Sequence, residues 1–351
     1  MTSTTHRPLV MTALVLAMLL AAMEATIVAT AMPSIAASVG GFSWYGWVFS
    51  SYLLMQAVTT PVFGKLADLY GRKPVFLVGT AIFLAGSALC ALAPTMQWLV
   101  FFRLLQGTGA GAITPTVITL AGDLYTLAER GKVQAYLSSV WGISSIVGPL
   151  AGGLIVEHFG WPWIFWINLP IGLFSGVLMT LCLHEKVEKR RLRLDLLGAF
   201  LLLLGLGALM LSLTLGRFEL AVLALVAGAF FVWQERRAPD PVVQLALWRQ
   251  PVVLRGNLTV LAIGIAMLGL IGFVPTYVQA VLGYSPLVAG FAMSAMCIGW
   301  PLSAMLAGRL LLSIGVRSLV RSGAVISLAG AGQIALTASY GPVWVGVGSF
   351  L

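Results

Sequence analysis

The chain has 351 residues, of which 60% are apolar and only 9% are charged, and its mean hydropathy is +1.00. Soluble domains carry roughly a quarter charged residues, so this composition excludes a soluble globular protein and indicates an integral membrane protein. The net charge of +9 comes from basic residues that collect in loops. We therefore do not expect nucleic-acid binding, which would need a basic face.

Apolar stretches of about 20 residues predict a series of membrane-spanning helices. In chain order they lie near residues 9–32, 44–65, 74–93, 97–121, 133–156, 163–183, 196–215, 219–234, 256–280, 287–307 and 319–338, and a twelfth begins near residue 342. The first run has no small-residue cleavage pattern, so we expect a retained helix. The three cysteines fall inside these runs without metal-ligand spacing, so we predict neither a disulfide nor a metal site.

The basic residues predict the orientation of these spans, because Lys and Arg collect in cytoplasmic loops. If the N-terminus is cytoplasmic, all Lys and Arg residues lie on the cytoplasmic side except Arg217, which lies outside, and Arg103, which lies within a span. The densest cluster, HEKVEKRRLR (184–193), is interpreted as an ordinary solvated loop between two halves of the chain.

An internal repeat supports two halves. The stretch PVFGKLADLYGRKPVFLVG (61–79) is repeated by GRLLLSIGVRSLVRSG (308–323) at one constant offset. The aligned pairs are Gly64 and Gly308, Lys65 and Arg309, Gly71 and Gly315, and Lys73 and Arg317. Both copies end an outside-to-inside helix, so the halves have the same orientation.

The first copy suggests a gating role. We expect Gly64 to allow close helix packing and Gly71 to take a positive φ. Asp68, Arg72 and Lys73 would supply charge contacts that can break during a conformational change. The alternative is a generic basic membrane loop.

GKLADLYGRKP (64–74) resembles the loop signature of the major facilitator superfamily. RLLQGTGAG (103–111) and GPLAGG (148–153) resemble that superfamily's fourth-helix motif and the fifth-helix motif of its antiporters. Its 14-span drug:H⁺ antiporter branch is resembled by MEATIVATAMPSI (23–35), WPWIFWINLPIG (161–172) and PTYVQAVLGYSPLVAG (275–290). The resemblance implies an all-α polytopic membrane fold of two parallel-related six-helix bundles, with two inserted helices and an incomplete C-terminal bundle.

The implied domains are an N-terminal six-helix bundle (1–183), a cytoplasmic basic loop (184–195), two inserted helices (196–234), a cytoplasmic loop (235–255) and a partial C-terminal bundle (256–351). A member of this branch would continue beyond Leu351. Its thirteenth helix would dock against the loop that holds Asp68. We therefore expect either a fragment or a degenerate member whose transport is in doubt.

Away from the ends of the predicted spans there are two charges, Glu24 in AAMEATIVATAMP (21–33) and Arg103. Glu24 is about 13 Å from Pro33 and Arg103 about 10 Å from Met96, so both lie at a similar depth in the outer half. If both spans line a central cavity, as the resemblance implies, wet and dry states of that cavity move Glu24 between its charged and neutral forms. A cationic drug would then expel the proton. The alternatives are a structural pair and a contact to substrate alone.

The branch usually has Asp where this chain has Glu24, and glutamate keeps the carboxylate with a longer reach. The candidate substrate contacts are other polar or aromatic residues of the spans: Tyr52, Gln56, Thr59, Gln106, Trp141, Gln279 and Trp300. The first three recur at i, i+4 and i+7, a polar stripe that we expect to face the cavity. The tryptophans would offer a cation–π surface to flat organic cations, with core packing as an equal alternative.

Four residues of the fifth span, Gly148, Pro149, Gly152 and Gly153, are expected to bend and thin that helix. Proline removes a backbone hydrogen bond and glycine allows a neighbouring helix to touch closely. A bend that seals one side of the cavity is the functional interpretation, and a passive packing kink is the alternative.

The sequence thus predicts a proton-coupled exporter of drugs or other hydrophobic, often cationic, small molecules in the cell membrane. It would use a proton gradient and no cofactor, in contact with substrate, protons and lipid. A dedicated metabolite transporter on the same fold and a truncated non-transporting member are the alternatives. An enzyme is not expected, because the three histidines lie in different loops. The oligomeric state is not predicted.

Overall fold

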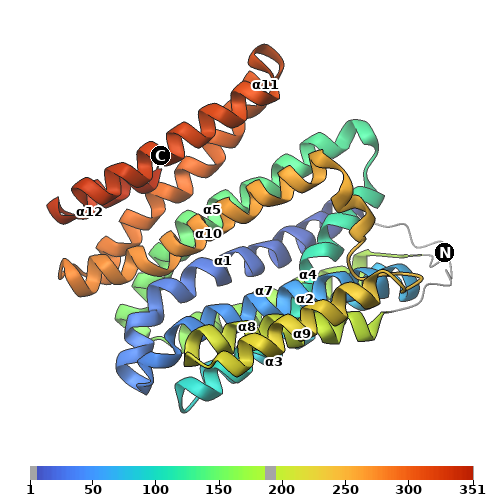
Figure 1. Cartoon of the computed structure of the whole chain (residues 1–351), viewed down its shortest axis with the longest axis horizontal. Helices are drawn as coiled ribbons and strands as arrows, with labels where there is room; N and C mark the ends of the chain where they lie inside the picture. Colours follow the sequence, from blue (N-terminus) through green and yellow to red (C-terminus); the bar gives the residue numbers. More distant parts are fainter. Residues whose placement is uncertain (1–5, 186–194, 351) are drawn as a thin grey trace. The chain divides into compact units, whose positions relative to one another are not determined.

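The structure is a computed structural model that describes residues 6–185 and 195–350, apart from some side chains inside helices, among them that of Trp300. These residues form helices and turns, with no strand among them (Figure 1). The helices are α1 (Arg7–Val39), α2 (Tyr45–Tyr70), α3 (Arg72–Ala91), α4 (Met96–Leu124), α5 (Leu127–Phe159), α6 (Trp163–Trp166), α7 (Asn168–Cys182), α8 (Leu196–Leu215), α9 (Phe218–Glu235), α10 (Pro251–Thr276), α11 (Pro286–Thr337) and α12 (Pro342–Phe350).

Most predicted spans correspond to one helix, and the helices are often longer than the apolar windows that predict them. The predicted span 163–183 is built from α6 and α7. Among the described residues, eight helices are long and apolar enough to cross a membrane. Those eight do not include α2 or α4, which carry more polar residues along their length.

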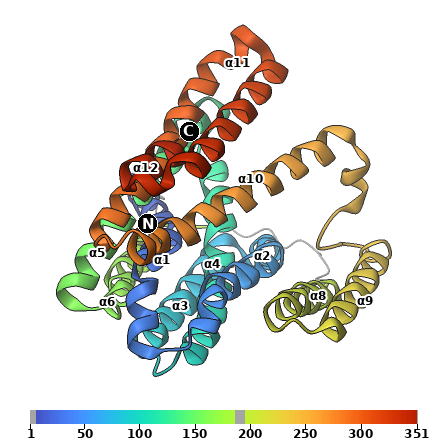
Figure 2. The same cartoon turned by 60° about the vertical axis from the view of Figure 1, so that its left-hand side comes forward.

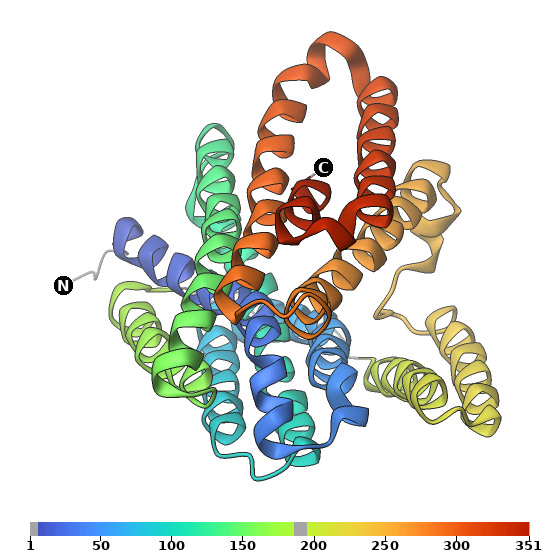
Figure 3. The same cartoon turned by 90° about the vertical axis from the view of Figure 1, so that its left-hand side faces the viewer.

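The predicted spans 287–307 and 319–338 lie within one element, α11, which changes direction at Gly315. Figure 3 shows α11 as two arms joined by a sharp turn. Gly315 has φ 74° and ψ 161°, and its counterpart Gly71, between α2 and α3, has φ 96° and ψ 156°. A positive φ favours glycine, so both copies of the repeat form the same backbone turn at the same position. The positive φ predicted at Gly71 is confirmed.

Side-chain caps help to set where several helices begin. Thr95 accepts a hydrogen bond from the Trp98 amide at the start of α4, and Ser285 accepts one from the Val288 amide at the start of α11. Asp195 does the same for α8 through the Gly198 amide, at 2.8 Å. Polar side chains at these positions satisfy amides that have no partner within the helix.

The chain divides into two compact units. The first contains the described parts of Met1–Ala17, Gly41–Arg130 and Asn168–Leu261, and the second contains those of Met18–Gly40, Gly131–Ile167 and Ala262–Leu351. The domain division expected from the sequence stays a prediction.

In the first unit, small residues bring α4 against α2 and α3. A Cβ atom on Gly109 of α4 would lie 2.6 Å from the Gly79 carbonyl oxygen of α3, so only glycine permits this approach. The pair α8 and α9 forms an antiparallel hairpin in the same unit (Figure 2), joined by a turn at Gly216, whose φ is 64°.

In the second unit, α12 packs against the first arm of α11. A Cβ atom on Gly346 would lie 3.6 Å from the Ala295 Cβ. A small apolar core in this unit contains Val274, Val278 and Ala289, all buried. This core joins the end of α10 to α11.

Candidate functional site

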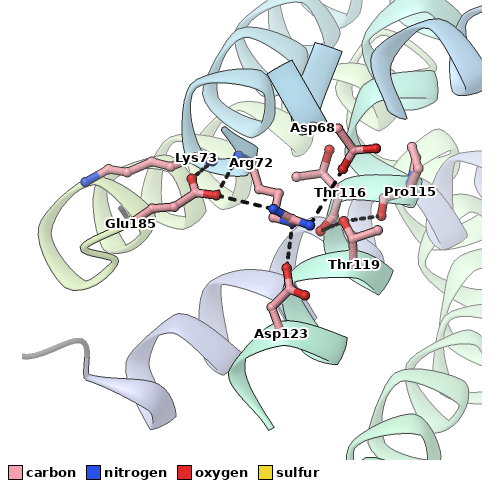
Figure 4. A network of polar contacts seen from close by, with 8 residues as sticks. All are labelled: Asp68, Arg72, Lys73, Pro115, Thr116, Thr119, Asp123 and Glu185. Carbon is pink, nitrogen blue, oxygen red and sulfur yellow. Dashed lines mark hydrogen bonds and ion pairs between the residues drawn. The ribbon is translucent and has the colours of Figure 1, made fainter. Parts of the chain in front are cut away.

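The turn between α2 and α3 carries a network of charges centred on Arg72 (Figure 4). The Arg72 guanidinium lies 2.6 Å from the Asp123 carboxylate of α4, 3.6 Å from that of Asp68 and 3.8 Å from that of Glu185. Three carboxylates from different parts of the first unit therefore share one cation. The side chains of Asp68 and Asp123 are 45% and 50% exposed. Exposed ion pairs contribute about 0.2–1 kcal/mol each, so these contacts can break and re-form.

Glu185 also holds the first turn of α3. Its two carboxylate oxygens accept hydrogen bonds from the backbone amides of Arg72 and Lys73, each at 2.9 Å. Its side chain is only 14% exposed. A carboxylate at a helix N-terminus satisfies amides that lack helical partners and favours the positive end of the helix dipole. Glu185 thus connects the segment after α7 to the turn.

The Lys73 side chain adds a second connection to the same segment. Its Nζ donates hydrogen bonds to the carbonyl oxygens of Thr180 and Leu183, each at 2.7 Å. An ammonium group near a helix C-terminus binds carbonyls that have no partner within the helix. Lys73 therefore binds the end of α7, whereas Asp68 pairs with Arg72.

Gly64 does not show the close packing predicted for it. In its own unit, a Cβ atom at Gly64 would meet no described atom within 4 Å. The close helix contacts in this region are instead made by the glycines of α4, which face α2 and α3. No described helix of this unit packs closely on Gly64, and the close helix approach expected there stays a prediction.

Arg103 on α4 is buried, with 1% of its surface exposed. Its Nε donates to the Val48 carbonyl of α2 at 3.0 Å, and one terminal nitrogen donates to the Gln106 side-chain oxygen at 2.8 Å. The Tyr52 ring of α2 lies under the guanidinium, with 4.3 Å from Cζ to the ring centroid. A carbonyl, an amide and an aromatic face together stabilise the buried cation.

The polar stripe of α2 lies against α4. Tyr52 is 2% exposed beneath Arg103, and the Thr59 hydroxyl lies 3.4 Å from the Thr108 carbonyl of α4. Gln56 is half-buried. Gln106 of α4 is fully buried against α3, where a Cβ atom on Gly86 would lie 2.6 Å from the Gln106 backbone nitrogen. The expectation that these residues contact substrate stays a prediction.

Glu24 is fully buried in the part of α1 that belongs to the second unit. Two residues further along, the Thr26 hydroxyl donates to the Met23 carbonyl at 3.2 Å and to the Ser144 carbonyl of α5 at 3.5 Å. Glu24 therefore lies in a buried part of α1, close in sequence to a contact between α1 and α5. Its predicted pairing with Arg103 stays a prediction.

The helix α5 approaches α1 where the sequence predicts thinning. A Cβ atom on Gly148 would lie 3.2 Å from the Thr26 Cβ, and one on Gly152 would lie 3.1 Å from the Ile27 carbonyl oxygen. Pro149 lies inside α5, and Gly153 is buried. Close contact is thus present at Gly148 and Gly152, whereas the bend and the sealing role stay predictions.

The remaining substrate candidates lie in the second unit. Trp141 on α5 is 42% exposed, and the Trp300 side chain lies outside the described residues. Gln279 lies in the middle of a π-helical turn, Tyr277–Val281, that follows Pro275. Its side-chain nitrogen is buried without a hydrogen-bond partner among the described residues. Wide turns of this kind occur often at functional sites.

Comparisons with known proteins agree with the motifs. The sequence model described as Major Facilitator Superfamily matches residues 14–351. Multidrug transporter protein MdtP of Bacillus subtilis (strain 168) is 36% identical over 302 residues, covering 83% of this chain and 56% of the relative. Multidrug resistance protein 3 of the same organism is 37% identical over 295 residues, covering 81% and 58%. The chain thus spans little more than half the length of these relatives.

A solved structure shows the same fold. The crystal structure of an auto-inhibited peptide transporter of the POT family matches with a TM-score of 0.63 and 17% identity, covering 98% of this chain and 78% of that one. This likeness confirms the all-α polytopic fold expected from the sequence.

Proposed function

Because the chain belongs to the Major Facilitator Superfamily, whose members span membranes several times, we propose that it exports drugs or other hydrophobic, often cationic, small molecules in exchange for protons. The names of the two Bacillus relatives, which cover most of this chain, support multidrug export. The observation that carries proton coupling is Glu24, a fully buried acid in an apolar helix.

Glu24 is proposed as the proton-binding group. A carboxylate inside a membrane helix costs several kcal/mol, so its presence calls for a role. Water entering the cavity favours the charged form, and its exclusion favours the neutral form. A cationic substrate competes with the proton for the same carboxyl group. Each imported proton supplies about 2.3 kcal/mol per 100 mV of membrane potential, which can drive export.

Arg103 is proposed as the fixed charge of the transport pathway. Its guanidinium is held by the Val48 carbonyl and the Gln106 amide, which limits its movement. A fixed cation disfavours cationic substrate near it and favours an ionised carboxyl group. Substrate would then bind chiefly through aromatic and amide groups, for which Tyr52, Trp141 and Gln279 are the candidates together with Gln56, Thr59 and Trp300.

Alternating access is proposed to use the charge network of the α2–α3 turn. The distribution of basic residues supports a cytoplasmic position for this turn and for the N-terminus. The contacts of Arg72 with three carboxylates would stabilise one conformation and break in another. A bend of α5, as expected from the sequence at Gly148 and Pro149, would close the opposite side of the pathway.

The test is export of ethidium from vesicles with an imposed pH gradient. We expect Glu24→Gln to reduce gradient-driven export by about tenfold or more, because glutamine cannot carry the proton. Exchange of ethidium across the membrane without a gradient should persist in Glu24→Gln, since that step needs no net proton movement. Glu219→Gln, which changes an exposed acid in the first turn of α9, is the matched control. Gradient-driven export that is unchanged in Glu24→Gln would overturn the coupling proposal.

A further inference from the structure

The segment that follows α9 is attached to the end of α2. The Lys65 ammonium donates a hydrogen bond to the Asp240 carbonyl oxygen and another, at 3.1 Å, to that of Pro241. Lys65 lies in the last turns of α2, and the two carbonyls lie 175 and 176 positions further along the chain. Two backbone carbonyls on one ammonium group form a specific contact, because Lys can orient three donors at once.

A carboxylate holds the next two residues of the same segment. Glu235, the last residue of α9, accepts hydrogen bonds from the amides of Val242 at 3.2 Å and Val243 at 2.7 Å. Glu235 is only 4% exposed. Residues 240–243 are therefore held from two sides, with their carbonyls on a cation of α2 and their amides on an anion of α9. We call this arrangement the clasp.

A further contact extends the clasp to α8. The Gln234 side chain donates to the Asp195 carboxylate at 3.0 Å, and the same carboxylate oxygen caps α8 through the Gly198 amide. A Cβ atom on Gly198 would lie 2.6 Å from oxygens of both Asp195 and Glu235. Both ends of the hairpin thus meet in one polar cluster, which the Lys65 ammonium joins to α2.

The clasp lies next to the charge network of the α2–α3 turn, which contains Asp68 and Arg72. Lys65 precedes Asp68 by three positions, so both side chains lie on the same side of the last turns of α2. Asp68 in turn contacts Arg72 at 3.6 Å. Deeper in the unit, α8 also packs on α2, since a Cβ atom on Gly207 would lie 3.9 Å from a Leu54 methyl group. The hairpin therefore supports α2 along its side and at its end.

We propose that the α8–α9 hairpin stabilises the α2–α3 turn through the clasp. Lys65 is then a positioning residue for the contact between Asp68 and Arg72. The clasp fixes the last turn of α2, and that turn sets where the Asp68 carboxylate meets the guanidinium. The role in transport rests on the proposed function, whereas the clasp itself does not.

The test combines hydrogen exchange with transport kinetics. Lys65→Met keeps the length of the side chain but removes its donors. We expect about tenfold faster amide exchange at Val242 and Val243, and at Gly71, whose amide binds the Ala67 carbonyl at 3.0 Å at the end of α2. The kcat of ethidium export should fall about tenfold with KM unchanged, because the substrate site is intact. Lys65→Arg keeps donors for both carbonyls. Its exchange rates and its kcat should therefore stay close to those of the unmodified protein.

Arg237→Met is the matched control. The Arg237 side chain stacks on Trp233 at the end of α9, so this substitution removes one positive charge without removing a contact of the clasp. Unchanged exchange at Val242 and Val243 in Lys65→Met would overturn the clasp. Faster exchange there with unchanged exchange at Gly71, or with unchanged kcat, would overturn the positioning role. If the unmodified protein exports nothing, the proposed function fails, and the exchange rates at Val242, Val243 and Gly71 still decide whether the clasp stabilises the α2–α3 turn.

Discussion

The two copies of the repeat have the same backbone turn and different chemistry. Gly71 and Gly315 share a positive φ and an extended ψ, so each half of the chain reverses direction at the same position. In the first copy Asp68 and Arg72 accompany the glycine, whereas the aligned positions in the second copy are Leu312 and Val316. The glycine turn is thus a structural element common to both halves, whereas the charged residues Asp68 and Arg72 have uncharged counterparts in the second copy.

The largest expected difference between the two copies of the repeat is in the export rate after a basic residue beside each turn is removed. We expect Arg72→Met to lower the rate of ethidium export by about tenfold or more, because three carboxylates would lose their shared counterion. Arg317→Met, which removes an exposed base next to the second turn, should change export less than about twofold. Export rates of the two variants in the same vesicles check this. Equal losses would show that the charge asymmetry has no functional meaning.

Substitution of the glycines should affect both copies alike in stability. Gly71→Ala and Gly315→Ala each place a side chain at positive φ, which costs about 1–2 kcal/mol. We expect similar decreases in the melting temperature of the purified protein. Export should fall further in Gly71→Ala, because that turn also positions Arg72. A much smaller decrease in melting temperature for one variant would contradict a shared backbone turn.

The smallest expected effect comes from Glu185. Loss of its carboxylate in Glu185→Ala removes the cap of α3 and should lower the free energy of unfolding by about 1 kcal/mol. Glu157→Ala, an exposed acid in the last turns of α5, is the control and should not destabilise the protein. Melting temperatures in detergent measure the difference. If Glu185→Ala and Glu157→Ala have the same melting temperature, the Glu185 cap does not stabilise α3.

Much of the fold can be read from the sequence, because apolar windows of membrane length leave few alternatives to helices. The turn at Gly71 is predictable as well, since the repeat aligns a glycine with a glycine. Helix ends are less predictable. Polar residues extend α1, α2 and α5 beyond their apolar windows, because a helix does not stop where hydrophobicity does.

The candidate site is only partly predictable. Asp68 and Arg72 are close in sequence, so their contact follows from helical spacing. The role of Glu185 is not predictable in the same way. It lies in a run of mostly basic residues, and its amide partners lie 112 and 113 positions away. Its position directly after an apolar span, opposite the start of another, is the one local signal. The partner of Lys65 in the segment after α9 gave no signal, because backbone carbonyls have no sequence signature.

The orientation of the α2 stripe shows a further limit. Spacing alone places Tyr52, Gln56 and Thr59 on one side of the helix, but it does not say what that side meets. The glycines of α4 bring that helix against α2, so Tyr52 lies on Arg103 and Thr59 approaches a carbonyl of α4. A polar stripe on a membrane helix can thus serve another helix as well as a cavity.

Proton release on substrate binding tests the central claim most directly. Ethidium is added to the purified protein in weakly buffered detergent solution, and the released protons are measured with a pH indicator. We predict that the unmodified protein and Glu219→Gln release protons as ethidium binds. Glu24→Gln should bind ethidium without releasing protons. Proton release of the same size from Glu24→Gln would contradict the assignment of Glu24 as the group through which export and proton movement are coupled.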